Sequence, residues 1–485
     1  MALNSSGPIS LGGTTTGQSI ALENGGSGTS TISLNDAAVR SLAGVASGAI
    51  AMPTDFWGKS NATYLLARFS NTEANWLTQD TSGNVFIGGN LNNSARMGVV
   101  RLTSAGVMTW GVGITAGTST PQNISLANPA SGTTIACTYA SNNFFFGKAT
   151  GNFISAYQSL SGFSSTPTYF SGFTLRSVVG APNGYLYGTG NALYSFCCSD
   201  WVRWGVARYN TSGVCDLLYY SDTVGQVPGQ CTYVDASNNV YTGGTELTGS
   251  SSYYGSWAKM NSSFGITVTG KQPSCDNALN IKTDSAGNIY VMFQRSGSTS
   301  VVLIKYNSSG TLQWQRGIGA TSGSTGNFQG SGLAVDTSDN IYVSGISDSS
   351  AGSYLLGASV VKFNSSGTVQ WQRRFYNTSY QNAYMGLTGQ TLLINAGVYV
   401  ITMRPTTGSG VVWYMPLDGT KTGSYPVTSA GTWTYSVDTI VPVTTTTLTG
   451  ATTSSLSWSS MGATGSSITS TYSSTAITTP TIVSV

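Results

Sequence analysis

A phrase that occurs twice in the sequence constrains the fold of this chain more than any other feature. The first copy reads TDSAGNIYV followed by VVLIKYNSSGTLQWQR, and the second reads VDTSDNIYVSG followed by VVKFNSSGTVQWQR. The two copies occupy the stretch from Asp284 to Trp371, and Asp284 lies 52 residues before Asp336. A repeat of about 50 residues, rich in β-branched and aromatic residues and punctuated by Gly, Asn and Ser, is typical of propeller blades. The repeat therefore predicts a β-propeller.

Each repeat unit contains four apolar runs joined by two kinds of tight turn. In D-x-x-G-N the Asp side chain can accept backbone N–H groups, while Gly or Asn adopts the left-handed conformation of a tight turn. This turn is expected to join the first strand to the second, and N-S-S-G to join the third to the fourth. A Trp follows nine residues after a Lys in both copies, at Lys305 and Trp314 and at Lys362 and Trp371.

Looser copies extend the repeat in both directions. Asp80 to Asn84 precedes VFIGG, Asp235 to Asn239 precedes VYTGG, and weaker copies surround Phe145, Tyr187 and Tyr399. We predict an all-β fold with a seven-bladed propeller, within a range of six to eight blades, over residues 61–425. Residues 64–76 have strand character but no preceding pair of strands, so they are expected to close the ring by pairing with the last blade, unless that blade supplies its own outer strands. A closed ring hides edge strands that could otherwise template aggregation.

Composition excludes several classes of protein. Only 8% of the 485 residues are charged while 40% are apolar, which is not the composition of a disordered chain. A net charge of +3 without a basic cluster argues against nucleic-acid binding. No apolar run reaches 18 residues, and MALNSSGPIS lacks the charged start and apolar core of a secretory signal, so neither membrane insertion nor signal-directed export is expected.

The residues needed for common catalytic chemistry are missing or already explained. The chain has no His, which excludes Ser-His and Cys-His schemes and makes an ordinary zinc site improbable. Asp80, Asp235, Asp284 and Asp336 recur at the same turn, so we interpret them as structural, with calcium ligation as the alternative. Paired carboxylates for glycoside cleavage stay formally open. We expect no enzyme activity, cofactor or metal, and we expect the six Cys residues to be reduced core residues.

The N-terminal 60 residues form a separate predicted module. GPISLGGTTTGQSIALENGG reads as two short strands, and TISLNDAAVRSLAG as a strand and a helix that Asn35 or Asp36 can cap. So short a segment buries little apolar surface, so it is expected to complete itself against a partner. GPISLGGTTTGQSI, SLNDAAVRSLAG and FWGKS resemble the N-terminal module of phage virion proteins found on tail and fibre-like chains, although ENGG at residues 23–26 departs from that pattern.

The resemblance implies a location and partners. It implies a virion protein, assembled in the host cytoplasm, that binds other virion proteins through residues 1–60 and is a homo-oligomer in the particle. The residues that we expect to dock are Leu34, Asn35, Asp36, Val39, Arg40, Leu42 and Trp57. The propeller itself resembles bacterial D-x-x-G-N-x-Y-V-x-G repeats, which is a weaker match because such turns arise independently.

The C-terminal extension, residues 426–485, is unusually rich in Ser and Thr. Its last 45 residues contain 25 of them and no charge. Alternation in SSLSWSS and SITSTYSS favours strands, with disordered low complexity as the alternative. Contact with a neighbouring subunit would supply order to these strands.

Two aromatic clusters, Tyr194 to Trp204 and Ser251 to Trp257, are the candidates for ligand recognition. Aromatic faces stack on sugar rings and their polar edges donate hydrogen bonds, so such loops suit a host-surface glycan. The alternative is that Trp204 and Trp257 pack between blades. The candidate binding residues are Tyr194, Asp200, Trp201, Arg203, Tyr253 and Tyr254. If the tight turns share one face of the ring, the longer loops share the other face, where recognition is usually placed.

Three functions are therefore in competition. A phage tail or fibre component that attaches to a host glycan is the preferred interpretation. A purely structural virion component, such as a capsid decoration or tail ornament, is the second, and a polysaccharide-cleaving tail enzyme is the third.

Overall fold

The computed structural model confirms an all-β chain with a short helical start. It describes residues 3, 8–15, 18–24, 27, 29–43, 48–52, 54–56, 65–70, 76–80, 82–90, 96–103, 108–115, 134–139, 143–148, 158–159, 170–196, 199–210, 215–222, 229–248, 252–320, 326–348, 356–377, 392–395, 398–406, 409–420, 422–427, 431–439, 441–445, 448, 458–461, 474–476 and 481–484. Helices α1 (Ile20–Glu23) and α2 (Ala37–Ala43) and the 3-10 turn η1 (Thr54–Phe56) all precede the first strand. The strands that follow, among these residues, form seven antiparallel sheets.

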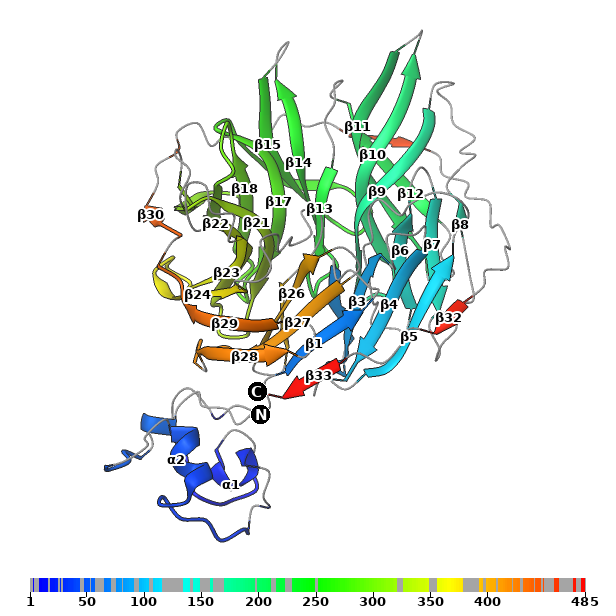
Figure 1. The fold of residues 1–485 in the computed structure, drawn as a ribbon. Coiled ribbons are helices and arrows are strands. Elements are labelled where there is room, and N and C mark those ends of the chain that lie inside the picture. Colours follow the sequence, from blue (N-terminus) through cyan, green and yellow to red (C-terminus); the bar gives the residue numbers. More distant parts are fainter. Residues whose placement is uncertain are drawn as a thin grey trace.

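The seven sheets are the blades, numbered here in chain order (Figure 1). Blade 1 contains β2 (Trp76–Gln79), β3 (Val85–Asn90), β4 (Arg96–Leu102) and β5 (Met108–Thr115), and blade 2 contains β6 (Thr134–Tyr139), β7 (Asn143–Lys148) and β8 (Gln158–Ser159). Blade 3 contains β9 (Phe170–Gly180), β10 (Leu186–Phe196), β11 (Ser199–Tyr209) and β12 (Cys215–Ser221), and blade 4 contains β13 (Gly229–Val234), β14 (Val240–Thr248), β15 (Ser252–Met260) and β16 (Ile266–Gln272). Blade 5 contains β17 (Cys275–Thr283), β18 (Ile289–Arg295), β19 (Val301–Tyr306) and β20 (Leu312–Ile318), and blade 6 contains β21 (Phe328–Val335), β22 (Ile341–Asp348), β23 (Leu356–Phe363) and β24 (Val369–Tyr376).

Blade 7 closes the ring by joining the two ends of the repeat region. It contains β25 (Leu392–Asn395), β26 (Val398–Thr406), β27 (Ser409–Pro416) and, as its next strand, β1 (Leu65–Ser70). Strand β1 pairs antiparallel with β27 from Leu65↔Tyr414 to Ser70↔Ser409. The predicted closing role of residues 64–76 is thus confirmed for β1, and the predicted propeller with seven blades, give or take one, agrees with the sheets observed.

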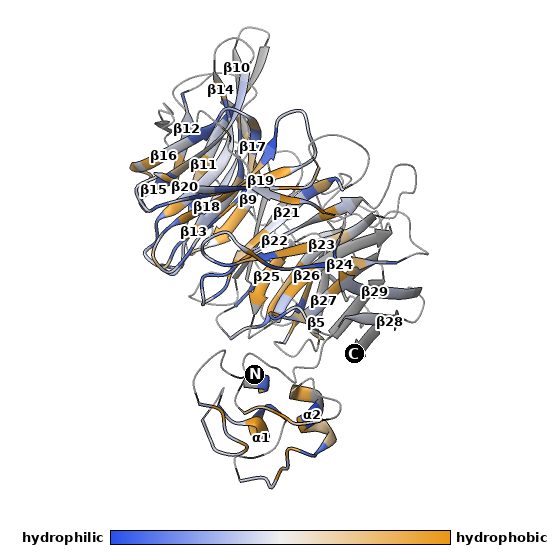
Figure 2. Ribbon diagram, turned by 90° about the vertical axis from the view of Figure 1, so that its left-hand side faces the viewer, coloured by the Kyte–Doolittle hydropathy of each residue, from blue (hydrophilic) through white to orange (hydrophobic). Residues whose placement is uncertain are grey.

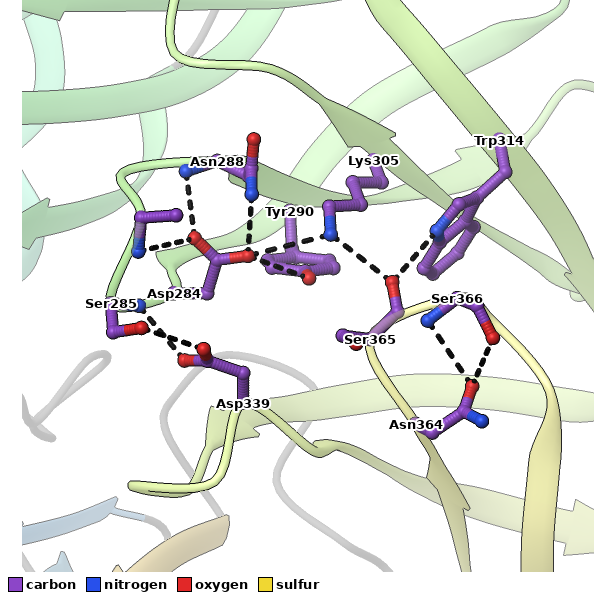
Figure 3. Close-up of polar contacts among 11 residues, drawn as sticks. Asp284, Ser285, Asn288, Tyr290, Lys305, Trp314, Asp339, Asn364, Ser365 and Ser366 are labelled. Carbon is purple, nitrogen blue, oxygen red and sulfur yellow. Dashed lines mark hydrogen bonds and ion pairs between the residues drawn. The ribbon is translucent and has the colours of Figure 1, made fainter.

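The D-x-x-G-N turn holds its conformation through the buried carboxylate of Asp284 (Figure 3). Its Oδ1 accepts the backbone N–H of Asn288 at 2.8 Å, and its Oδ2 accepts the Asn288 amide at 2.8 Å and the Tyr290 hydroxyl at 3.0 Å. Lys305 Nζ lies 3.4 Å from Oδ2. Gly287 has a φ of 76°, the left-handed region that the turn requires. Burial alone would raise the pKa of Asp284, but the hydrogen bonds from Asn288 and Tyr290 and the charge of Lys305 lower it below its ordinary value.

The Lys–Trp pair of the repeat connects blade 5 to blade 6 and blade 6 to blade 7. Lys305 Nζ and Trp314 Nε1 both donate to the carbonyl oxygen of Ser365, in the N-S-S-G turn of the following blade, at 3.1 and 3.2 Å. Lys362 and Trp371 repeat the arrangement on the carbonyl of Leu417, at 3.0 and 3.2 Å. The nine-residue spacing places a Lys on the third strand opposite a Trp on the fourth strand. Both side chains can therefore reach the same carbonyl oxygen in the next blade.

The C-terminal extension forms a belt around the propeller. We use the name C-terminal belt for β28 (Gly423–Val427), β29 (Gly431–Val437), β30 (Val443–Thr445), β31 (Trp458–Met461), β32 (Ser474–Ala476) and β33 (Thr481–Ser484). In chain order, β29 pairs with blade 6, β30 with blade 5, β31 with blade 3, β32 with blade 1 and β33 with blade 7. The belt therefore passes the blades in the reverse of their own order, and its strands lie around the molecule (Figure 1).

The start of the belt is anchored in the core between blades 6 and 7. Trp433 and Tyr435 are fully buried, and Tyr435 stacks on Phe375 of blade 6 with ring centroids 4.6 Å apart. Tyr399 of blade 7 donates its hydroxyl to the Tyr435 hydroxyl at 2.7 Å. Of the predicted strands of the extension, SSLSWSS is confirmed in its described part as β31, whereas SITSTYSS lies outside the described residues except for Ser474, which begins β32. A neighbouring subunit is not needed for the order of the described belt strands. Pairing with the chain's own outer strands supplies it.

The N-terminal module has its own small core (Figure 2). Ile20, Val39 and Phe56 are buried together, with both helices contributing apolar residues. The prediction of two short strands at residues 7–26 is wrong for the described part of that segment, where a single parallel bridge, Ser10↔Ser19, leads into α1. A helix forms instead because the Ser19 hydroxyl accepts the Leu22 N–H and so caps the run IALE. The predicted helix after Asp36 is confirmed as α2, whereas the predicted strand before it is absent from residues 31–33.

Candidate functional site

The connections between strands of a blade divide between two faces of the ring. The tight turns of neighbouring blades meet on one face: Asn183 N–H donates to the Asn238 side chain at 3.0 Å, and Ser285 N–H donates to Asp339 Oδ1 at 2.8 Å. Because the strands are antiparallel, the connections between second and third strands lie on the opposite face, here called the long-loop face. The predicted tight-turn face is thus confirmed for these blades. The expectation of longer loops on the opposite face is wrong for blades 3 and 4, where two residues separate β10 from β11 and three separate β14 from β15, against five at the tight turn of each blade.

Blades 3 and 4 extend farthest on the long-loop face (Figure 1). Strands β9, β10 and β11 each contain eleven residues, more than any other strand in the described ranges, and β14 and β15 contain nine each. The two hairpins β10–β11 and β14–β15 belong to adjacent blades, whose strands β10 and β13 pack together. Both aromatic clusters singled out from the sequence lie on these hairpins.

Tyr253 and Tyr254 occupy the start of β15 near the tip of its hairpin. Tyr253 is 44% exposed, one of five large hydrophobic side chains exposed among the described residues, while Tyr254 is partly buried. Their partners in β14 are Leu247 and Glu246. Glu246 is buried, accepts the Ser256 hydroxyl at 2.9 Å and lies 3.6 Å from Lys271 Nζ, so its charge stabilises the hairpin. Tyr253 is therefore the predicted binding residue best placed for a ligand.

The other candidates lie on the β10–β11 hairpin. Its register places Tyr194 opposite Trp201 and Ser195 opposite Asp200, close to the hairpin tip. The side chains of Tyr194, Asp200 and Trp201 lie outside the described part of the chain. The Arg203 guanidinium lies over the Tyr220 ring at 5.2 Å from its centroid, which directs it toward β12 rather than toward the hairpin tip.

Trp204 and Trp257 pack between blades, as the alternative interpretation of these clusters predicted. Trp204 is fully buried and its Nε1 donates to Thr189 in its own blade at 2.9 Å and to Thr242 in blade 4 at 3.0 Å. Trp257 is fully buried with its ring 5.1 Å from that of Tyr306 in blade 5. These two aromatic residues are structural.

The turn Asp residues act on the turns in which they lie. Asp235 and Asp336 accept the same Asn amide and Tyr hydroxyl bonds as Asp284. Asp80 accepts the amide of Asn84 at 2.7 Å, but the Tyr position of that blade is Phe86. In the described ranges no group of three His, Cys, Asp or Glu side chains is arranged to hold a metal ion. These contacts support the structural interpretation of the four Asp residues.

The expected docking residues divide between the surface and the core of the N-terminal module. Val39 and Leu42 are buried in that core, and Leu34 packs partly against it. Asn35 and Asp36 are exposed, and Asp36 accepts the Ser33 N–H at 2.7 Å. Arg40 donates to the carbonyl of Gly48 at 2.8 Å. Trp57 lies outside the described residues, so Asn35 and Asp36 form the exposed part of this set.

A cavity of about 270 Å³ lies on the axis of the propeller, a feature that we did not predict. The innermost strands of six blades line it: β2, β9, β13, β17, β21 and β25. Its lining residues come from the ends of these strands that lead into the tight turns, so the cavity lies toward the tight-turn face. One layer of the lining consists of Thr78, Val179, Tyr233, Lys282 and Ala334.

Lys282 is the only charged side chain among the described residues that line this cavity. Its Nζ lies over the Tyr233 ring, 4.8 Å from the centroid. Thr283 Oγ1 donates to the Tyr233 hydroxyl at 3.3 Å, which fixes the ring edge. Burial lowers the pKa of Lys282 to about 8, although the Cys231 thiol opposes this shift.

The signal for this site was present in the repeat but was not used. In four blades the residue two positions before the turn Asp lines the axis: Thr78, Tyr233, Lys282 and Ala334. Aligning the repeats at this position would have marked Lys282, because a charged residue stands where the other blades have neutral ones. The candidates chosen from the sequence lie in the turns and loops instead.

The cysteines whose side chains the structure describes are Cys215, Cys231 and Cys275, and all three are free and buried. Burial raises the pKa of each thiol to about 12. A thiol with so high a pKa is a poor nucleophile at neutral pH, because the thiolate is the reactive form. These three residues therefore serve the core, as predicted.

Comparisons with known proteins add little beyond the architecture. No protein-family profile matches the sequence, and no curated protein matches it. Among solved structures, the β-propeller domain of Cps50 (Swd1) from Myceliophteria thermophila aligns with 72% of this chain and 99% of its own length, at 9% identity and a TM-score of 0.42. The fold assignment accordingly rests on the strand pairing itself. Within the described ranges, the helices are too short and too polar for a membrane span.

Proposed function

We propose that this chain is a phage virion structural protein, associated with the tail or a tail fibre, that attaches to a host-surface glycan. Residues 1–60 dock it to other virion proteins, and the propeller presents the long-loop face. The supporting observations are the resemblance of the N-terminal phrases to virion modules and the pair of extended hairpins in adjacent blades.

The observation that carries the attachment proposal is the exposure of Tyr253 at the tip of the β14–β15 hairpin. The Tyr253 ring is 44% exposed and so accessible to a ligand, and aromatic rings bind the apolar faces of sugars. Leu247, its partner in β14, widens the apolar surface. The rigid propeller holds this surface in place, so little conformational entropy is lost on binding.

The structure of the belt suits a protein exposed outside a cell. Propeller blades end in edge strands, and an exposed edge can pair with other chains. Here the C-terminal belt pairs with the outer strand of five blades. A particle protein benefits from such protection because it persists without chaperones.

Glycan binding by the purified chain tests the proposal. On an array of host-surface polysaccharides, the wild-type chain is expected to bind at least one polysaccharide. Tyr253→Ala and Tyr254→Ala are expected to weaken that binding by about 1 to 3 kcal/mol each, in the range of interface hot spots. Leu312→Ala is the matched control, since Leu312 is 37% exposed but begins β20, next to a tight turn.

The outcomes separate the proposed functions. Loss of binding in the two Tyr variants but not in Leu312→Ala supports attachment through the long-loop face. Binding by none of the variants or the wild type would favour the purely structural role, in which this face packs against other virion subunits. Release of shortened polysaccharide during the assay would favour the tail enzyme.

A further inference from the structure

The axial cavity has the chemistry of a binding site for a small acid. Its volume of about 270 Å³ lies just below the range of roughly 300 to 1,000 Å³ that is usual for drug-sized ligands, which limits an occupant to about one sugar ring. Apolar walls from Val178, Val335 and Ile394 alternate with the hydroxyls of Thr78 and Thr232. This mixture of apolar surface and a few fixed polar groups is typical of small-molecule sites.

The charges around the cavity favour an anion. Lys282 contributes the positive charge, and the described lining contains no carboxylate. The nearest turn carboxylates are already engaged: Asp284 with Lys305 at 3.4 Å, and Asp235 with the Asn239 amide at 2.8 Å and the Tyr241 hydroxyl at 3.1 Å. A bound carboxylate would therefore meet one cation and little opposing charge.

We infer that the axial cavity binds a carboxylate-bearing molecule of monosaccharide size, such as a uronic acid, with Lys282 as the partner of the carboxylate. The Tyr233 ring, over which the Lys282 ammonium lies, positions that ammonium, and the Thr hydroxyls form hydrogen bonds with the hydroxyl groups of the ligand. The site stands apart from the proposed attachment function, because it lies toward the tight-turn face rather than at the hairpin tips.

Calorimetry at pH 7 with D-glucuronate as the probe tests this inference. Glucuronate is expected to bind the full chain with one site per propeller, and D-glucose, which lacks the carboxylate, is expected to bind at least about tenfold more weakly. Lys282→Met should reduce glucuronate affinity by a similar factor. Lys282→Arg should retain part of the affinity, because it keeps the charge but changes its geometry.

Lys259→Met is the matched control. Lys259 also lies over a Tyr ring, 5.6 Å from the centroid of Tyr241, but it does not line the cavity. Its replacement should leave glucuronate binding unchanged. Melting temperatures of all variants, measured beside the binding, show whether each remains folded, and Lys282→Arg is informative even if Lys282→Met does not fold.

A pH series supplies an independent readout. Because the pKa of Lys282 is about 8, the ammonium is lost as the pH rises from 7 to 9, and glucuronate affinity should fall over that range. The titratable groups that face Lys282 are Tyr233 and Cys231 on β13, whose pKa values burial raises, that of Cys231 to about 12, so neither loses its proton in this range. No other described lining residue titrates there.

Three results would overturn the inference. One is absence of glucuronate binding by the wild-type chain. Another is equal binding of glucose and glucuronate, which would remove the role of the carboxylate. The third is unchanged glucuronate affinity in folded Lys282→Met, which would place the acid elsewhere on the molecule. Binding of inorganic phosphate without binding of glucuronate would equally reject the assignment to a carboxylate.

Discussion

Single carboxylates at the tight turns hold the blades in register. The Asp284 carboxylate accepts the backbone N–H and the side-chain amide of Asn288 and the hydroxyl of Tyr290, and it lies 3.4 Å from the Lys305 ammonium. These residues lie in the turn, in β18 and in β19 of blade 5. The Asp284 side chain is 2% exposed, so the Asn288 amide and the Tyr290 hydroxyl are held by a buried acceptor, while Lys305 has a second acceptor in the Ser365 carbonyl. Removing a buried acceptor costs the desolvation of the donors that it leaves unpaired.

Replacing Asp284 should therefore destabilise the propeller measurably. We expect Asp284→Ala to lower the free energy of unfolding by about 2 to 4 kcal/mol, because the Asn288 amide and the Tyr290 hydroxyl lose their buried acceptor and the half-buried Lys305 ammonium loses its carboxylate. Asp80→Ala is the matched control at the same turn of blade 1, where Phe86 supplies no hydroxyl and Arg101 lies 3.8 Å away. Its loss should be smaller. Urea denaturation measures both, and equal losses would contradict the account.

At the scale of the element, the C-terminal belt behaves as part of the fold. Its strand β29 places Tyr435 against Phe375 and Tyr399, and its Asp438 is buried and accepts the Ser359 hydroxyl. Farther along, the Gln315 side chain both donates to the Leu448 carbonyl, at 3.0 Å, and accepts the Leu448 N–H, at 2.9 Å. The belt is thus anchored by side chains as well as by strand pairing.

Two substitutions in β29 test this role. Tyr435→Ala should lower the free energy of unfolding by about 3 to 5 kcal/mol, as other large buried aromatic residues do when truncated. Val437→Ala, two residues along the same strand, should change it by less than about 0.5 kcal/mol because Val437 is 58% exposed. Limited proteolysis should release the belt first in Tyr435→Ala. A stable Tyr435→Ala variant would mean that the propeller folds independently of the belt.

The sequence predicted the blades well because their turns carry specific chemistry. Asp284 and Asn288 could be recognised without knowing the fold, since few residues form such a turn. Even the weak copy around Tyr187 forms the same turn, with Ala181 in place of Asp and the backbone bond from Ala181 N–H to the Tyr185 carbonyl retained. Local chemistry of this kind survives the loss of one side chain.

Features set by distant contacts could not be predicted in the same way. The belt strands β30 to β33 are short, uncharged and rich in Ser and Thr, and they pair with strands more than 100 residues away, which leaves no local pattern in the sequence. The axial cavity arises only when six innermost strands meet, which is why Lys282 looked like an ordinary strand residue. Helix α1 was missed because a four-residue helix depends on its cap more than on its composition.

At the scale of the whole molecule, the account assigns a different role to each part. In the proposed function, the N-terminal module docks, the belted propeller is a rigid body, and the β14–β15 hairpin of blade 4 presents Tyr253 near its tip. On the tight-turn face, the turns of neighbouring blades are held to one another by hydrogen bonds. Orientation in the particle therefore decides whether the hairpins can reach a host surface.

Locating this chain in intact particles by cryo-electron microscopy tests the central claim most directly. The account predicts density for the chain on the tail or a tail fibre, with residues 1–60 contacting other virion proteins and the β10–β11 and β14–β15 hairpins facing outward. Absence of the chain from particles, or a long-loop face buried beneath other subunits, would contradict it.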